Sequence, residues 1–176
     1  MKSRKSYEAY FDEVLKASGE ILKRHGFVRR GSVFRLLQQG NCGIIEFQRS
    51  DKTSNDTLLF TLNVGVVCGE LLDSETTDIH KARIIDAQLS QRIGRLLPER
   101  SDKWWEIGAS TDQSLFTQGM VDLLENCAVP YVLKYLSRDA LSSLWESGQS
   151  PGLTAVQRSR FLSRLRETLP EGTESI

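Results

Sequence analysis

Three segments in the middle of the chain carry polar side chains that could bind a partner. Side chains two positions apart point to the same face of a strand, so these groups are expected to gather on one face of a sheet. Guanidinium, carboxylate, amide and hydroxyl groups on such a face bind a partner through hydrogen bonds. The candidate binding residues are Arg35, Glu46, Gln48, Thr61, Asn63, Arg92 and Arg95, with the last two at the margin.

Structural roles explain the same polar residues equally well. An antiparallel sheet often leaves one face in contact with water, and a buried amide such as that of Asn63 needs hydrogen-bond partners inside the protein. Arg35 and Glu46 are expected to face each other as an ordinary cross-strand ion pair. This pairing favours a structural role for Glu46 over a catalytic one.

Motifs for metal and nucleotide binding are missing from the sequence. It has no GxGxxG, GxxxxGK[ST], HExxH or CxxC pattern, and its two histidines are His25 and His80. No serine or cysteine is marked as a nucleophile by a neighbouring base. The sequence therefore predicts no catalytic residue, no metal site and no cofactor.

Basic residues cluster at the end of the first expected helix and along the last one. The chain as a whole has 23 basic and 23 acidic side chains and a net charge of zero. A neutral chain favours solvated helix faces over a nucleic-acid interface, so nucleic acid is an unlikely partner. The two clusters are Lys23, Arg24, Arg29 and Arg30, and Arg158, Arg160, Arg164 and Arg166.

Length and composition predict one compact domain in the cytoplasm. The chain has 176 residues, close to the size of a single domain. No run of about 18 apolar residues suggests a membrane span, and the N-terminus lacks the apolar region of a signal peptide. The three cysteines, Cys42, Cys68 and Cys127, form no close pair, which is typical of free thiols in a reducing compartment.

Helical periodicity over residues 7–25 predicts an amphipathic first helix. Gly26 is expected to end it with a positive φ, and Phe27 to fold back on Leu22. Two strand-like runs follow, at residues 33–39 and 42–49, and Gly40-Asn41 between them is expected to be a two-residue hairpin loop. This loop would place Phe34 opposite Phe47, Leu36 opposite Ile45, and Arg35 opposite Glu46.

The rest of the chain shows strands first and helices afterwards. Residues 57–67 form the strongest strand pattern, residues 92–97 and 104–107 look like short strands, and residues 79–91 are ambiguous. Adjacent Trp104 and Trp105 are expected on opposite faces, one of them deeply buried.

From Ser110, which forms a possible capping box with Gln113, the pattern is helical. Pro130 predicts a break or kink near Ala128 or, as an alternative, the opening of the next helical piece at residues 131–136. Ser137 and Thr154 are expected to begin two further helices. This order predicts an α+β fold: an antiparallel sheet of about five strands with N-terminal and C-terminal helices packed on it.

Six short segments carry a resemblance to a known family. In chain order they are Gly26-Phe27, Phe34-Arg35, and residues 47–50, 60–65, 92–96 and 102–105. Their order and spacing over residues 7–136 resemble the bacterial family of domains of unknown function DUF4304. The resemblance implies an α+β domain without assigned catalytic residues and, for some members, a suspected role beside bacterial toxin systems.

Residues 1–136 are expected to form an α+β core domain, and residues 137–176 a C-terminal helical extension packed on the same domain. The favoured function is a non-catalytic protein-binding module, immunity-type or regulatory, with an unknown protein partner. The acidic stretch at residues 70–78 would suit a basic partner.

Two other functions stay open. The first is a small enzyme or ligand-binding protein that uses the polar face, and the second is a nucleic-acid binder that uses the last helix. A deep pocket lined by Arg35, Gln48, Asn63 and Arg92 would favour the enzyme, and a flat face would favour the binding module.

Overall fold

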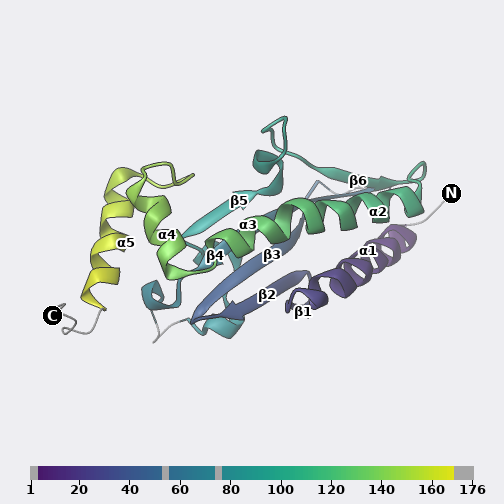
Figure 1. Cartoon of the computed structure of the whole chain (residues 1–176). Coiled ribbons are helices and arrows are strands. Elements are labelled where there is room, and N and C mark those ends of the chain that lie inside the picture. The colour runs from purple at the N-terminus through teal and green to yellow at the C-terminus, as the bar shows by residue number, and fades with distance from the viewer. Residues whose placement is uncertain (1–3, 53–55, 74–76, 169–176) are drawn as a thin grey trace.

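The computed structural model describes residues 4–52, 56–73 and 77–168. Antiparallel strands in the order β1-β2-β3-β4-β5 form its sheet, and β6 pairs with another part of β4. Helices lie before and after the strands in the chain (Figure 1), which confirms the α+β class. The strands are β1 Val28–Arg30, β2 Val33–Gln38, β3 Asn41–Arg49, β4 Thr57–Val67, β5 Leu89–Arg92 and β6 Trp105–Gly108.

The helices begin and end close to where the sequence places them. They are α1 Arg4–Arg24, α2 Gln113–Leu123, α3 Val129–Tyr135, α4 Arg138–Glu146 and α5 Ala155–Glu167. Gly26 has a φ of 86°, and the amides of Gly26 and Phe27 donate to the carbonyls of Lys23 and Leu22. These two hydrogen bonds form a Schellman motif, which confirms the predicted end of α1.

The β2–β3 hairpin has a different register from the expected one. Phe34 pairs with Ile45, Leu36 with Gly43 and Arg35 with Ile44. The loop consists of Gln39 and Gly40, whose φ values are 51° and 76°. A type I′ turn requires a positive φ at both positions, and this turn overrides the predicted Gly40-Asn41 loop.

The register error leaves the faces unchanged. A shift of two residues returns each side chain to the same face because strand side chains alternate with a period of two. Phe34 and Phe47 are therefore diagonal neighbours, with ring centroids 5.8 Å apart. Arg35 and Glu46 are no longer directly opposite each other, so the expected cross-strand ion pair is wrong.

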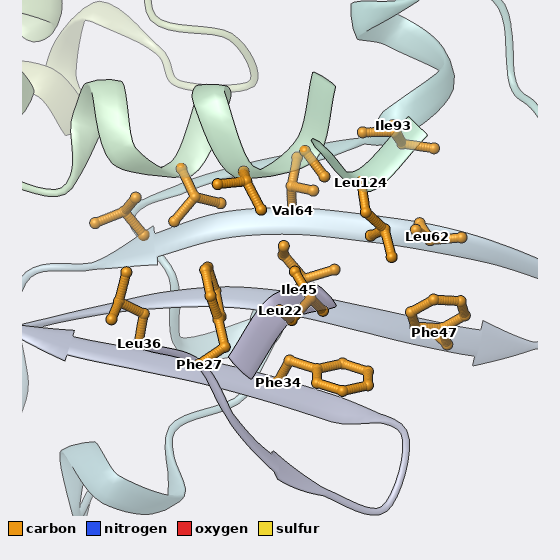
Figure 2. Packing of buried hydrophobic residues seen from close by; sticks show 14 of the residues in the cluster. Leu22, Phe27, Phe34, Leu36, Ile45, Phe47, Leu62, Val64, Ile93 and Leu124 are labelled. Carbon is orange, nitrogen blue, oxygen red and sulfur yellow. The ribbon is translucent and has the colours of Figure 1, made fainter. Parts of the chain in front are cut away.

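One side of the sheet, here called the helix side, is covered by α1, α2 and α3. Figure 2 shows Phe34, Ile45, Phe47 and Val64 of the strands in one apolar layer with Leu22 of α1 and Leu124. Phe60 lies at the centre of an aromatic cluster and is fully buried. Its ring contacts those of Phe11, Phe47, Trp105 and Phe116, with centroids 5.0–6.1 Å away.

Pro130 is accommodated without a break between α2 and α3. One π-helical turn, Leu124–Ala128, joins the two helices, because a proline has no amide to donate to the carbonyl four residues earlier. The expected break or kink near Ala128 is thus a local widening of a continuous helix. Pro130 lies in the first turn of α3, which agrees with the alternative that it opens the next helical piece. The N-cap of α2 is Asp112, whose side chain accepts from the amides of Ser114 and Leu115, and not the predicted Ser110.

The C-terminal helices pack against the same core. Ser137 and Thr154 cap α4 and α5, as predicted. The side chains of Leu141, Trp145 and Leu165 are buried in the cluster that includes the helix side of the sheet. Figure 1 places both helices at the end of the sheet away from the N-terminus.

Two expectations for residues 92–107 are wrong. Only Arg92 of the segment 92–97 lies in a strand, β5, and Ile93–Leu96 form a 3-10 turn. Trp104 and Trp105 are both half-buried, and neither lies deep in the core. Trp105 stacks on Phe60 of the helix side with centroids 6.0 Å apart, whereas Trp104 lies under the guanidinium of Arg92.

Candidate functional site

The outer side of the sheet, opposite the helices, is covered in its middle by residues 78–88, here called the covering segment. This segment contains two short 3-10 turns, Ile79–Lys81 and Ile84–Asp86. It buries a second, smaller apolar cluster against the sheet. The fully or nearly buried members are Val33, Cys42, Ile44, Val67 and Ala82. The polar face is therefore neither fully wet nor covered by the C-terminal helices.

Arg35 holds the covering segment on one side. Its Nε donates to the carbonyl of Ala82 at 2.6 Å, and its Nη2 lies 3.4 Å from the carbonyl of Lys81. Glu46 holds the segment on the other side, since its carboxylate contacts Arg83 Nη2 at 3.1 Å and accepts from the amide of Ile84 at 3.4 Å. Both candidate residues thus bind a loop of their own chain.

Thr61 is also used inside the protein. The side chain is fully buried, and its hydroxyl donates to the carbonyl of Lys103 at 2.7 Å. This bond fixes the segment that leads into β6. Thr61, Arg35 and Glu46 therefore match the structural alternative, a network of hydrogen bonds that satisfies polar groups on the sheet.

Gln48, Asn63 and Arg92 come together in an open depression beyond the covering segment. The Asn63 amide donates to Gln48 Oε1 at 2.8 Å, and Asn63 pairs with Arg92 across β4 and β5. The volume of the depression is about 380 Å³, and its lining comprises Gln48, Asn63, Ile84, Ile85, Ser90, Gln91 and Arg92. It unites three of the seven candidate residues.

Arg92 is held in place by two neighbours. Its Nη1 lies 2.6 Å from the Asp102 carboxylate, and its guanidinium lies over the Trp104 ring, 5.0 Å from the centroid. Asp102 also accepts from the Trp104 indole at 3.0 Å. The hydrogen bonds from Arg92 and Trp104 lower the pKa of Asp102, so this carboxylate stays ionised and is a poor general acid.

Arg95 lies at the margin, as expected. It is exposed, and its guanidinium donates to the carbonyl of Arg100 at 3.0 Å. It lines a second depression that shares Ser90, Gln91 and Arg92 with the first. We call the residues around these two depressions the open surface: Gln48, Asn63, Ile85, Gln91, Arg92, Arg95 and Trp104.

Ile85 is the member of the open surface that sequence reasoning missed. Its side chain is 86% exposed and lines the depression beside Arg92. An isoleucine so exposed in a short turn contributes nothing to the core. The pair Ile84-Ile85 could have revealed it from the sequence. A short turn packs only one side on the sheet, so two consecutive apolar residues leave one of them exposed.

A further motif that sequence reasoning missed is GxSxG, at residues 148–152. In serine hydrolases this pattern joins a strand to a helix, whereas here it lies between α4 and α5. The Ser150 hydroxyl is buried and has no hydrogen-bond partner within the described part of the chain. The pattern therefore lacks both the turn and the base that would activate a serine nucleophile.

The acidic stretch is partly neutralised within the protein. Glu70 pairs with Arg138 at 2.7 Å, and Asp78 with Lys81 at 3.7 Å. Residues 74–76 lie outside the described residues. The described part of this stretch is thus a weak candidate for a surface that attracts a basic partner.

The described residues offer neither a cluster of metal ligands nor a helix that could cross a membrane. Across residues 4–52, 56–73 and 77–168, no three His, Cys, Asp or Glu side chains come close enough to hold a metal ion. None of the helices found there combines the length and apolar character needed to cross a membrane.

Comparisons with known proteins identify a family without an assigned activity. No curated protein and no solved structure matches the chain. The family model described as "Domain of unknown function (DUF4304)" matches residues 18–134. This match covers well over half of the sequence and includes the last third of α1, the whole sheet, α2, and α3 almost to its end. The chain therefore belongs to the DUF4304 family.

Proposed function

We propose that the protein is a non-catalytic protein-binding module that contacts its partner through the open surface. The observation that carries this proposal is the 86% exposed side chain of Ile85, which lines the same depression as Arg92. An exposed apolar group beside arginine and tryptophan is typical of the centre of a protein interface, where these residue types contribute most of the binding energy.

The shape and charges of the depression favour a protein over a small substrate. Its lining residues Gln48, Ile85 and Ser90 are exposed, which makes the depression shallow. Three carboxylates around it are engaged: Glu46 contacts Arg83, Asp102 contacts Arg92, and Asp86 accepts from the backbone amide of Arg83. A general acid or base needs a carboxyl free to exchange its proton with a substrate, so these contacts disfavour an enzyme.

Preorganisation of the polar groups supports binding at modest entropic cost. Gln48 is already hydrogen-bonded to Asn63, and Arg92 is already stacked on Trp104. Side chains that are ordered before association lose less rotamer freedom when the partner arrives. A regulatory or immunity-type partner, such as a protein inhibited by the complex, suits a surface of this kind.

The cysteines support a cytoplasmic location within this proposal. Cys42, Cys68 and Cys127 are free. Burial raises the pKa of the Cys42 thiol to about 11, so it stays protonated and unreactive at neutral pH. Three unpaired thiols fit a reducing compartment.

The proposal is tested by site-specific photocrosslinking in the native host. A photoreactive phenylalanine analogue replaces Ile85 in one variant and Leu115 in another. Leu115 is 73% exposed on α2 and is the matched control away from the open surface. We expect a discrete crosslinked protein from position 85 and none from position 115.

Competition and substitution then decide the outcome. Excess unlabelled wild-type protein should abolish the crosslink at position 85, and Asn63→Ala should weaken it while leaving the circular dichroism spectrum unchanged. Equal crosslinking from both positions, or no partner at position 85, contradicts the proposal.

A further inference from the structure

A third depression lies on the outer side at the opposite edge of the sheet, beyond the covering segment. Its volume is about 460 Å³, within the range of small-molecule sites. We call it the edge pocket. Its lining residues are Gly26, Val28, Arg29, Arg30, Arg35, Leu37 and His80. It shares none of them with the open surface, so its role is independent of the proposed function.

The charge of the edge pocket is positive and not balanced by carboxylates. Three of its lining residues are arginines, one is histidine and none is acidic. Within the described part of the chain, no carboxylate lies within 4.0 Å of Arg29, Arg30 or Arg35. By contrast, Arg83 and Arg92 each contact a carboxylate.

Arg30 and Arg35 lie on the outer side of the strands, whereas the side chain of Arg29 lies on the helix side, with its guanidinium over the Phe34 ring, 6.0 Å from the centroid. Arg35 is fixed by a neutral group, since its Nε donates to the carbonyl of Ala82 at 2.6 Å. A carbonyl orders a guanidinium without cancelling its charge. Each guanidinium has five N–H donors, so Arg30 and Arg35 keep donors available for an oxyanion.

The acid closest in sequence to this cluster does not cancel it. Asp78 accepts from the backbone amide of His80 and pairs with Lys81. The carbonyls at the end of α1, near Gly26, are occupied by the Schellman hydrogen bonds. Both sources of negative charge are therefore already engaged.

The edge pocket also offers an apolar surface. Val28 lies opposite Arg35 across β1 and β2, and Leu37 is the next residue of β2 on the same face. Their side chains are 72% and 41% exposed, which is unfavourable for free apolar groups. A ligand with an apolar portion next to its charge would cover both.

We propose that the edge pocket binds a small phosphate ester. The phosphate contacts Arg30 and Arg35 with His80 beside it, and the organic group lies on Val28 and Leu37. Arginine binds phosphate oxygens through charge-assisted hydrogen bonds, often two at once. The pocket is too small for a macromolecular interface and large enough for one nucleotide-sized molecule.

The test is isothermal titration of the full chain with adenosine monophosphate and, separately, with inorganic phosphate. We expect adenosine monophosphate to bind more tightly than phosphate because its organic part covers the apolar surface. Arg30→Gln should weaken both at least about tenfold, as expected for a lost charge-assisted hydrogen bond. Arg160→Gln, an exposed position on α5, removes the same charge elsewhere and should change neither.

Val28→Ser separates the two parts of the ligand. It should reduce the affinity for adenosine monophosphate to that for phosphate and leave phosphate binding unchanged. Equal affinity of the wild-type protein for both probes overturns the ester in favour of free phosphate. No binding of either probe, or an equal loss in Arg30→Gln and Arg160→Gln, overturns the site altogether.

Discussion

The two sides of the sheet are covered in different ways. On the helix side, α1, α2 and α3 bury a continuous apolar layer with the aromatic cluster of Phe60 at its centre. On the outer side, a short loop covers four buried apolar residues of the strands, against which its own Ala82 packs, and is held at its edges by Arg35 and Glu46. The helix side is stabilised mainly by apolar burial, and the outer side by polar contacts to a loop.

This difference explains where the candidate binding residues are found. Polar residues on the outer side have different uses. Glu46 fixes the covering segment, Thr61 fixes the segment before β6, and Arg35 both fixes the covering segment and lines the edge pocket. Other polar residues lie in the depressions on either side of the covering segment. The covering segment thus divides one polar face into the open surface and the edge pocket. A sheet face covered only in its middle provides two separate sites.

The largest loss of stability is expected from a substitution in the aromatic cluster of the helix side. Phe60→Ala removes a fully buried ring with four aromatic neighbours. It should lower the free energy of unfolding by about 3–5 kcal/mol, measured by urea denaturation. Leu59→Ala, the next residue of β4 with a half-buried side chain on the outer side, is the control. A loss as large for Leu59→Ala would show that the two sides contribute equally.

Alanine substitutions at two strand glycines, one on each side of the sheet, compare the packing of the two sides directly. A methyl group on Gly43 would collide with the buried side chain of Val132 of α3, and one on Gly65 would lie 2.6 Å from the carbonyl oxygen of Leu89 and 2.8 Å from Cδ1 of Ile84. Both alanine variants should lose about 1–3 kcal/mol of unfolding free energy, the usual effect of overpacking.

The two glycine variants should differ in which part of the structure becomes less stable. Gly65→Ala should speed proteolysis of the covering segment under native conditions, because the added methyl group displaces both Ile84 of that loop and Leu89, the residue of β5 that directly follows it. Gly43→Ala should lower the urea midpoint without this local cleavage. If both variants are cleaved alike, the covering segment is not an independently opening unit.

Sequence periodicity predicted the helix side well and the outer side poorly. The helical pattern of α1, its end at Gly26 and the apolar alternation of β4 are local features, so they can be read from neighbouring residues. The hairpin register depends on a choice between two loops that differ by one residue. The positive φ of Gln39 allows the tighter turn, and this register also places Gly43 where Val132 needs space.

The candidate site was predicted only in part for the same reason. Gln48 and Asn63 belong to adjacent strands, and their contact follows from the sheet. The roles of Arg35 and Glu46 depend on the covering segment, which has no periodicity and lies 37–47 residues away in sequence. Long-range contacts between a strand and an irregular loop leave no pattern in a single sequence.

A smaller loss of stability is expected when the polar contacts between the sheet and the covering segment are weakened. Glu46→Gln keeps the shape but removes the charge that Arg83 contacts. Since Arg83 is 64% exposed, the loss should be about 1 kcal/mol. Hydrogen exchange at the amide of Ile84 should accelerate while that of the core of β4 stays unchanged. Glu106→Gln, an exposed carboxylate on β6, should leave both rates as they are.

The smallest effect concerns the pH dependence of the open surface. The pKa of Asp102 is lower in the folded protein than its ordinary value of 3.8, so over the interval between the two values the unfolded chain binds more protons. The contribution of this carboxylate to the free energy of unfolding is therefore fully present above about pH 4. It is lost as the pH falls through the pKa of Asp102 in the folded protein. Because the pair is exposed and screened by salt, its contribution stays below about 1 kcal/mol.

Asp102→Asn provides the measurement for this last prediction. The variant should show a shallower fall in unfolding free energy between pH 4 and pH 2 than the wild-type protein, with the two curves parallel above that range. The indole resonance of Trp104 should shift with pH in the wild-type protein and not in the variant, because its hydrogen bond ends on this carboxylate. A wild-type titration of that resonance at or above pH 4 would mean that Arg92 does not hold Asp102 ionised, and that the arginine of the open surface is less ordered than its contact with Trp104 implies.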